Sequence, residues 1–306
     1  MIIKETVTDD FFNEFNSLTE FVNRNIQDLY SNKPDNIPLR LWECMFYSLN
    51  AGGKRLRPVL CLKSAETFGL SREEAIPMAL GLEMIHTASL IHDDLPCMDN
   101  DSLRRGKPTN HIVFGEALSL LAGTSLFLFG IEYPSMILSK SKIHNDCIFN
   151  AVSVLTKHAG ATGIHGGQVL DTDRESQRND PEFVWDIASM KTAALIQASV
   201  ETGAILASAE TDKVSILKEY GKHLGLAFQI VDDMLDIKGN SSELGKTTGK
   251  DLEQNKITFV KNYGYEKAKD FAVMESDSAL ACAMDLFNEK NNFFSQLALY
   301  LQSRTS

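Results

Sequence analysis

Proline is missing from the carboxy-terminal part of this sequence. The chain has 306 residues and eight prolines, and all of the prolines lie at or before Pro181. Long helices exclude proline from their interiors, because it lacks a backbone N–H and clashes with the preceding turn. The sequence also has no lasting strand-like alternation, no βαβ spacing, no internal repeat and no low-complexity linker. These absences predict one all-α domain over residues 1–306. We expect loops near 31–38, 95–110, 171–182 and 239–256.

Cysteine and basic residues are both scarce. The five cysteines are scattered and form no C-x-x-C pair, which argues against a disulfide framework or a zinc site and for a reducing compartment. Thirty Lys and Arg against 41 Asp and Glu give a net charge of -11. Proteins that bind nucleic acid or anionic membranes in general carry the opposite balance. We therefore expect no nucleic-acid partner, and any phosphate must be met by local basic residues or by metals held on carboxylates.

Long apolar runs are absent as well. The best candidate for a membrane span is residues 117–131, which lie between Glu116 and Glu132 and fall short of the roughly 20 residues that a span requires. The run is predicted to be a buried core helix. The amino terminus turns acidic before any apolar stretch forms, so no signal peptide is expected. These features predict a cytoplasmic protein with no stable membrane anchor.

Helix start and stop signals mark two helices in the first third of the chain. Pro58 opens an apolar run that ends at Gly69, and Ser71 with Glu74 forms a capping-box pattern ahead of a run that reaches Ile91. The second run has the helical period of three and four residues. Its repeating positions are Ala75, Met78, Leu82, Ile85 and Ser89.

A first cluster of carboxylates follows this second helix. Residues 92–101 read HDDLPCMDND. Asp93 and Asp99 are six apart and would lie on opposed faces of an unbroken helix. Pro96 breaks the helix between them. We therefore expect the chain to fold Asp99 back toward Asp93.

A second cluster ends a helix that begins near Thr211. Residues 229–236 read QIVDDMLD, so Asp232, Asp233 and Asp236 share one helix face and Gln229 lies on it one turn earlier. Like charges at this spacing repel one another and are costly beside an apolar interior. Mg²⁺ would neutralise them, because it uses few carboxylates and completes its shell with water and substrate phosphate. One such cluster is typical of a solvated helix end, but two clusters flanked by apolar helices favour a metal site.

A third acidic stretch lies between residues 171 and 182. Its carboxylates at Asp171, Asp173, Glu175 and Glu182 imitate the ligand spacing of a calcium loop. Ser176 stands where such a loop requires glycine. We assign no metal to this stretch.

The basic residues gather near the two clusters. Residues 52–58 read GGKRLRP and place three cations at a glycine-hinged helix start, where free N–H groups and the helix dipole favour a diphosphate. Lys191 interrupts the apolar segment ASMKTAALIQASV, so it needs a partner. The other cations near the clusters are Arg104, Arg105, Lys107, Lys246, Lys250 and Lys256.

Six motifs in order resemble those of the trans-isoprenyl diphosphate synthases, in particular short-chain bacterial farnesyl and geranylgeranyl diphosphate synthases. The motifs are GGKRLRP, HTASLIHDDLPCMDNDSLRRGKPTNH, GGQVLD, MKTAALI, FQIVDDMLDIKG and GKTTGKD. The resemblance covers roughly residues 40–260. It implies a helical bundle around a deep central cavity, dependence on Mg²⁺ and a homodimer. It also implies head-to-tail condensation of isopentenyl diphosphate with dimethylallyl, geranyl or farnesyl diphosphate through an allylic carbocation, giving farnesyl or geranylgeranyl diphosphate.

The resemblance assigns roles to individual residues. Asp93, Asp99 and Asp232 would hold Mg²⁺ against the allylic diphosphate, supported by Asp94, Asp233, Asp236 and Gln229. Arg104, Lys191, Thr192, Lys246 and Lys256 would meet the same diphosphate. Isopentenyl diphosphate would be held by Lys54, Arg57, His86 and Arg105. Ala88 and Ser89, one to two turns before Asp93, would set the product length. Asn255 and Val260, on either side of Lys256, depart from the usual glycine and proline of the last motif.

Two other functions fit part of the pattern. A class I terpene cyclase also ionises a prenyl diphosphate with Mg²⁺, but it would carry an N/D-x-x-S/T-x-x-x-E signature where this chain has a second aspartate cluster. A non-catalytic subunit that regulates an active partner should have lost aspartates, and both clusters are intact. Consumption of isopentenyl diphosphate distinguishes all three.

Overall fold

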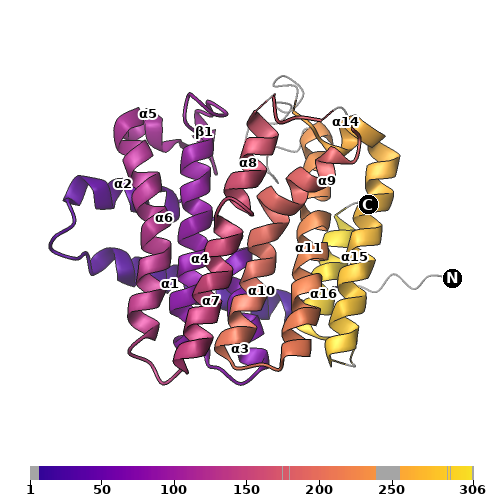
Figure 1. The fold of residues 1–306 in the computed structure, drawn as a ribbon, viewed down its shortest axis with the longest axis horizontal. Coiled ribbons are helices and arrows are strands. Elements are labelled where there is room, and N and C mark those ends of the chain that lie inside the picture. Colours follow the sequence, from indigo (N-terminus) through magenta and orange to yellow (C-terminus); the bar gives the residue numbers. More distant parts are fainter. Residues whose placement is uncertain are drawn as a thin grey trace. The chain divides into compact units, whose positions relative to one another are not determined.

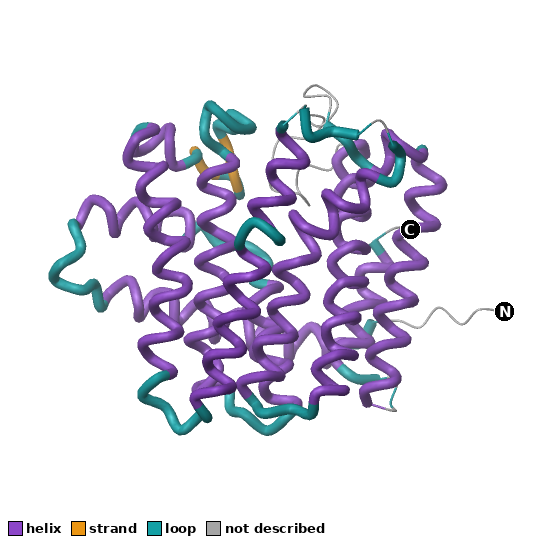
Figure 2. Tube along the Cα trace, viewed as in Figure 1, coloured by secondary structure: helices purple, strands orange, loops and turns teal. Residues whose placement is uncertain are grey.

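The computed structural model describes residues 7–173, 175–178, 180–238, 256–287, 289 and 291–304. The chain is 76% helical. The strands in the described residues are two short ones, β1 (Leu103–Arg104) and β2 (Lys107–Pro108), which pair antiparallel in a hairpin. Figure 2 shows this hairpin in orange among purple helices. The all-α fold class predicted from the sequence is confirmed.

The helices follow one another along the chain as Figure 1 labels them. They are α1 (Asp9–Ser31), α2 (Leu39–Leu49), α3 (Leu56–Thr67), α4 (Arg72–Asp93), α5 (Asn110–Phe114), α6 (Glu116–Leu138), α7 (Asn145–Ala159), α8 (Ile164–Thr172), α9 (Phe183–Ile187), the π-helix η1 (Ala188–Ala193), α10 (Ala194–Leu206), α11 (Thr211–Lys238), α14 (Phe259–Tyr263), α15 (Tyr265–Phe287) and α16 (Phe293–Ser303).

The chain forms two compact units. Unit 1 comprises Met1–Asn16, Lys157–Glu201 and Ala209–Ser306, and unit 2 comprises Ser17–Thr156 and Thr202–Ser208. Each aspartate cluster lies in a different unit, the first in unit 2 and the second in unit 1. The single domain over residues 1–306 stays a prediction.

Helix α4 is central to unit 2, where it packs against α2, α3 and α6. Its first turn has the predicted capping box, because the hydroxyl of Ser71 accepts from the Glu74 N–H at 3.3 Å and donates to the Glu74 carboxylate at 2.7 Å. The helix then runs without a break to Asp93. The cap and the apolar period thus deliver the first aspartate cluster to the end of one rigid element.

Helices α4 and α6 approach each other closely at two glycines. A Cβ added to Gly81 would lie 2.4 Å from the carbonyl oxygen of Gly130 and 3.0 Å from the Cγ of Pro134. Pro134 lies inside α6, and Pro77 lies inside α4. Proline thus occurs inside helices here as well as at their starts and breaks. The ring of Pro134 fits because its neighbour, Gly81, has no side chain.

The prediction that residues 117–131 form a buried core helix is wrong. This segment lies in α6, a helix of 23 residues that is long and apolar enough to cross a membrane by length and composition, and only 28% of its apolar window is buried. The face that meets α4 carries small residues such as Ala122 and Gly123, whereas leucines point outward. The most exposed of these are Leu120 (51%), Leu121 (59%) and Leu128 (61%).

Helix α11 lies in unit 1 and packs along α15. It begins at Thr211, as the sequence predicts. An apolar cluster that includes Ile230, Met234 and Phe259 lies against its last turns. The ring of Trp185 meets Phe259 edge to face at 4.7 Å. This packing fixes the end of α11 that carries the second aspartate cluster.

Candidate active site

The chain reverses direction directly after α4, as Pro96 predicted. The backbone N–H of Asp99 donates to the carbonyl oxygen of Asp93 at 2.9 Å, and that of Asn100 donates to the carbonyl of Leu95 at 3.1 Å. Asp93 and Asp99 are therefore brought together although six residues separate them. Both residues are half-buried.

Asp94 differs from its neighbours because it is buried against Arg104. The guanidinium of Arg104 donates to the Asp94 carboxylate at 2.6 Å and reaches Asp101 at 3.4 Å. Burial raises the pKa of Asp94 to about 7, and the positive charge of Arg104 opposes that shift. Thr109 donates to the Asp101 carbonyl at 2.6 Å and so ties the far side of the hairpin to the same loop. Asp94 thus holds Arg104 in place.

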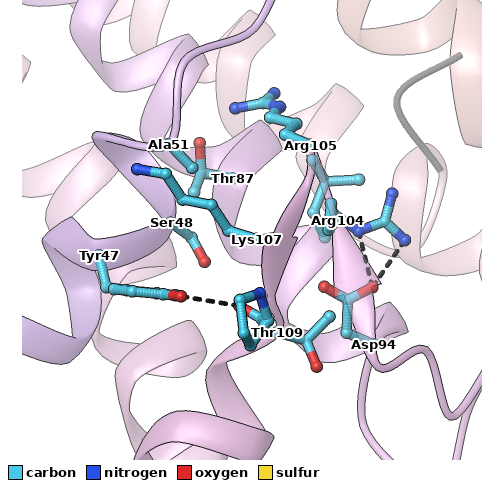
Figure 3. Close-up of a pocket in the computed structure, with 11 residues that line it drawn as sticks. Tyr47, Ser48, Ala51, Thr87, Asp94, Arg104, Arg105, Lys107 and Thr109 are labelled. Carbon is cyan, nitrogen blue, oxygen red and sulfur yellow. Dashed lines mark hydrogen bonds and ion pairs between the residues drawn. The ribbon is translucent and has the colours of Figure 1, made fainter. Parts of the chain in front are cut away.

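A small pocket lies beneath the β1–β2 hairpin (Figure 3). Arg104 and Asp94 form one wall of it, and Tyr47 bonds to the Pro108 carbonyl at 2.9 Å on the other side. Its remaining lining includes Ser48, Thr87, Arg105, Lys107 and Thr109. Arg104 and Arg105 were predicted to bind two different diphosphates, and the hairpin holds them side by side.

The three cations of GGKRLRP differ in how far their side chains are exposed to solvent. Lys54 is exposed and Arg57 half-buried, but Arg55 is buried, with 3% of its surface exposed. The Arg55 guanidinium is bonded to Glu83 at 2.6 Å. Lys54 and Arg57, the two cations of this motif that the resemblance assigns to isopentenyl diphosphate, are thus the two that are not buried. Sequence reasoning missed the partner of Arg55 because it lies 28 residues away on another helix.

His86 lies about two turns before the end of α4, among arginines. Its pKa is lowered well below 6.5, first by burial and then by the charge of Arg57, with smaller contributions from Arg105, Arg104 and Arg55. The imidazole is therefore neutral at pH 7. Arg105 bonds to the Gly52 carbonyl, and a Cβ on Gly53 would lie 2.6 Å from its guanidinium carbon. The glycines thus let Arg105 lie against the GGKRLRP loop, and three of the residues predicted to bind isopentenyl diphosphate, Arg57, His86 and Arg105, lie near one another.

The second cluster is organised by a chain of hydrogen bonds within unit 1. Thr192 donates to the Gln229 side-chain oxygen at 2.5 Å, and the Gln229 amide donates to Asp233 at 2.7 Å. The other carboxylate oxygen of Asp233 accepts from the Phe259 N–H at 2.9 Å. Asp233 and Asp236 are buried while Asp232 is half-buried. Asp232 is therefore the most accessible carboxylate of this cluster, and Asp233 orients its surroundings.

Lys191 has the partner that its apolar surroundings required. Its ammonium donates to the Asp171 carboxylate at 2.5 Å, and Asp171 is nearly buried. Lys191 and Thr192 lie on η1, and π-helical turns often occur at functional sites. A Cβ on Gly167 would lie 2.3 Å from the Lys191 backbone nitrogen, so α8 and η1 meet closely at this point. From the sequence, Asp171 was considered only as part of a calcium-like pattern to which no metal was assigned. Its place at the end of the GGQVLD motif could have indicated a role in the site.

Other predicted residues have less structural context. Lys246 and Lys250 lie outside the described residues, and Lys256 is half-buried just before α14. Ala88 is fully buried, whereas Ser89 is partly exposed and donates to the His86 carbonyl at 2.8 Å. In the described parts of the chain, no three His, Cys, Asp or Glu side chains form a group that could hold a metal ion by itself.

Comparison with known proteins identifies the family. The sequence profile of the family described as polyprenyl synthetase matches residues 39–292. The chain is 46% identical over 266 residues to large subunit 1 of the chloroplastic heterodimeric geranylgeranyl pyrophosphate synthase of Arabidopsis thaliana, covering 86% of this chain and 71% of that protein. It is 40% identical over 311 residues to a dimethylallyltranstransferase of Fischerella ambigua, covering 99% and 88%. A geranyltransferase of Helicobacter pylori, solved with magnesium and isoprenyl diphosphate, has a TM-score of 0.78 at 28% identity over 98% of each chain.

An all-helical chain with two aspartate-rich helix ends and adjacent basic loops fits the class of enzymes that act on prenyl diphosphates. The profile match and the relatives go further. The chain belongs to the polyprenyl synthetase family, and it is a short-chain prenyltransferase.

Proposed function

We propose that this prenyltransferase condenses isopentenyl diphosphate with dimethylallyl, geranyl and farnesyl diphosphates to give a mixture of farnesyl and geranylgeranyl diphosphates. The observation that carries the proposal is the turn after α4, in which the Asp99 N–H bonds to the Asp93 carbonyl. This turn brings the backbones of Asp93 and Asp99 together, and the adjacent hairpin carries two arginines of the opposite charge. A site of this kind suits a metal-bound diphosphate.

The carboxylates fit Mg²⁺ rather than a metal that requires a full protein cage. Hard oxygen donors are the ligands that Mg²⁺ prefers, and it commonly takes one or two carboxylates together with substrate phosphates. By the family resemblance Asp93, Asp99 and Asp232 would hold it, and Asp94 and Asp233, which bond to Arg104 and Gln229, would support them. Mg²⁺ bound there would supply positive charge to the diphosphate as it leaves.

The chain's own cations would then act in two groups. Arg104 and Lys191 would stabilise the charge that develops on the departing allylic diphosphate. The other group, Lys54, Arg57 and Arg105, would bind isopentenyl diphosphate and orient its double bond for attack on the allylic cation. His86 is neutral and would donate a hydrogen bond without adding charge. The proton lost after condensation would go to the departing diphosphate.

Product length would be set along α4. Ala88 precedes Asp93 by five residues, roughly 7 to 8 Å along the helix axis at about 1.5 Å per residue. An alanine there leaves the space below the first cluster open to a growing chain, and Ser89 presents a small side chain one position later. The expected outcome is that elongation continues beyond farnesyl when isopentenyl diphosphate is in excess.

We also propose that a second copy of this chain covers the outer face of α6. Three leucines on that face are each at least half exposed, and Ile112 on the preceding α5 is 57% exposed. Large apolar side chains exposed together in this way are typical of an interaction site. If a second copy covers this apolar face, no membrane is needed to cover it, which agrees with the cytoplasmic location expected from the sequence. Light scattering on the purified protein should give a dimer, and Leu121→Glu combined with Leu128→Glu should give a monomer.

The proposed activity is tested by incorporation of radiolabelled isopentenyl diphosphate. Purified protein should incorporate label into an allylic acceptor with Mg²⁺ present, and a chelator should abolish incorporation. A terpene cyclase would release a hydrocarbon from the allylic substrate without consuming label. A non-catalytic subunit would leave both substrates unchanged. Either of these results would contradict the proposal.

A further inference from the structure

We propose that Arg55 is a positioning residue, which sets the affinity for isopentenyl diphosphate without touching it. The inference rests on the proposed function, because it assumes that Lys54 and Arg57 bind this substrate. It concerns Arg55, the one cation of GGKRLRP that is buried, to which the resemblance assigned no contact with either diphosphate.

The Arg55 guanidinium joins three other helices to the start of α3. Nη1 donates to Glu83 on α4 at 2.6 Å, Nε donates to Asn23 on α1 at 2.9 Å, and Nη2 donates to the Leu49 carbonyl at the end of α2 at 2.7 Å. The side chains of Arg55 and Glu83 are each only 2% exposed. A planar guanidinium with a fixed fork of donors satisfies such a set of acceptors, and a lysine cannot reproduce it.

The backbone at Arg55 is itself held in an unfavourable conformation. Its φ is +49°, in the left-handed region that residues with side chains seldom adopt. Such a conformation persists only where surrounding contacts determine it, and it often occurs at functional sites. The residue before it is Lys54, and Arg57 lies on the first turn of α3 after it. Fixing φ at Arg55 therefore fixes the directions in which both of these cations leave the loop.

Glu83 extends the coupling to the rest of the site. It lies on α4 one turn before His86 and ten residues before Asp93, so the buried ion pair sets α3 in register with the helix that carries both. If the pair is broken, Lys54 and Arg57 lose their alignment with His86. The aspartate turn is held by its own bonds within residues 93–100 and should keep its geometry.

A second ion pair offers a matched control. Arg72 at the start of α4 donates to Glu66 on α3 at 2.7 Å. This pair also ties α3 to α4, but it lies at the end of α3 remote from GGKRLRP and is partly exposed. It shares the chemistry and the two helices of the first pair. It differs in its greater exposure and in having no connection to the substrate-binding cations.

The test is steady-state kinetics on the full-length protein, varying each substrate in turn. Arg55→Lys should raise the KM for isopentenyl diphosphate about ten- to hundredfold, as losses of supporting residues behind a ligand do. The KM for the allylic diphosphate and kcat at saturation should change by less than about threefold, because the metal carboxylates keep their positions. Arg57→Ala gives the reference for a lost direct contact, and Arg72→Lys should leave all three constants unchanged.

A double variant separates positioning from simple stability. In Arg55→Met with Glu83→Met, both buried charges are gone, and replacement of such a pair by apolar side chains often preserves folding. We expect a thermal midpoint near that of the wild type together with a raised KM for isopentenyl diphosphate. A normal KM in the double variant or in Arg55→Lys would overturn the inference, as would an equal rise in both substrate KM values. A wild-type protein that consumes no isopentenyl diphosphate would instead overturn the proposed function.

Discussion

Replacement of Asp171 by asparagine tests whether this carboxylate holds Lys191 for catalysis. The Lys191 ammonium lies 2.5 Å from the Asp171 carboxylate, and their side chains are 23% and 7% exposed. The ammonium has three donors, so a bond to Asp171 is compatible with bonds to a diphosphate. Asp171→Asn keeps the size of the side chain and removes its charge. It should therefore loosen Lys191 without emptying the space between α8 and η1.

The expected magnitudes follow from burial. A hydrogen bond to a charged group contributes roughly 1.5–3 kcal/mol, and partial exposure of Lys191 places the loss near about 2 kcal/mol. For a chain of 306 residues that corresponds to a fall of about 3 °C in the thermal midpoint, at an unfolding entropy of roughly 2.1 cal/mol/K per residue. A misplaced Lys191 should lower kcat by about ten- to hundredfold. Circular dichroism and incorporation of labelled isopentenyl diphosphate measure the two effects.

Asp186→Asn is the control for this experiment. Asp186 is paired with Arg178 in the same unit, but both side chains are more than half exposed. Exposed pairs contribute about 1 kcal/mol or less, so midpoint and kcat should stay close to the wild-type values. If Asp171→Asn behaved like Asp186→Asn in both assays, the account of Lys191 would be refuted.

Three further predictions concern other parts of the site. Asp93→Ala and Asp232→Ala should each lower kcat by orders of magnitude in a protein that remains folded by circular dichroism, because each removes a ligand that acts in the ionisation step; a near-normal kcat in either would contradict the two-cluster mechanism. Ala88→Tyr should shorten the product to farnesyl diphosphate or less by mass analysis. If the wild type and this variant both gave only farnesyl diphosphate, a residue other than Ala88 would limit the product length. The pKa of His86 is lowered from 6.5 in the folded chain. As the pH falls, the imidazole therefore binds a proton in the unfolded state while it stays neutral in the folded state. Stability should then fall as pH drops below about 6.5, by at most about 1.4 kcal/mol per pH unit from this group. Urea unfolding between pH 7 and 5.5 should show a smaller fall in His86→Gln, and equal slopes would count against this assignment.

Local signals in the sequence predicted the elements that carry the first cluster. Ser71 and Glu74 gave the start of α4, the apolar period gave its length, and Pro96 gave the turn that returns Asp99. These features depend on residues within a few positions of each other, so the sequence contains the whole interaction. The start of α11 at Thr211 was predictable for the same reason.

Pairings between distant residues were not predictable in this way. Arg55 and Glu83 are 28 residues apart, and Lys191 and Asp171 are 20 apart. Which of several carboxylates meets a given cation depends on how helices pack, and composition does not determine that. The exposure of α6 was missed because an apolar helix has the same sequence pattern whether it is covered by its own chain or by a second copy.

The most direct test of the central claim is mass analysis of the products formed from dimethylallyl diphosphate, excess isopentenyl diphosphate and Mg²⁺. We expect farnesyl and geranylgeranyl diphosphates, with geranyl diphosphate appearing first and then declining. Recovery of both substrates without any elongated diphosphate would contradict it, as would a cyclised hydrocarbon in place of a longer diphosphate.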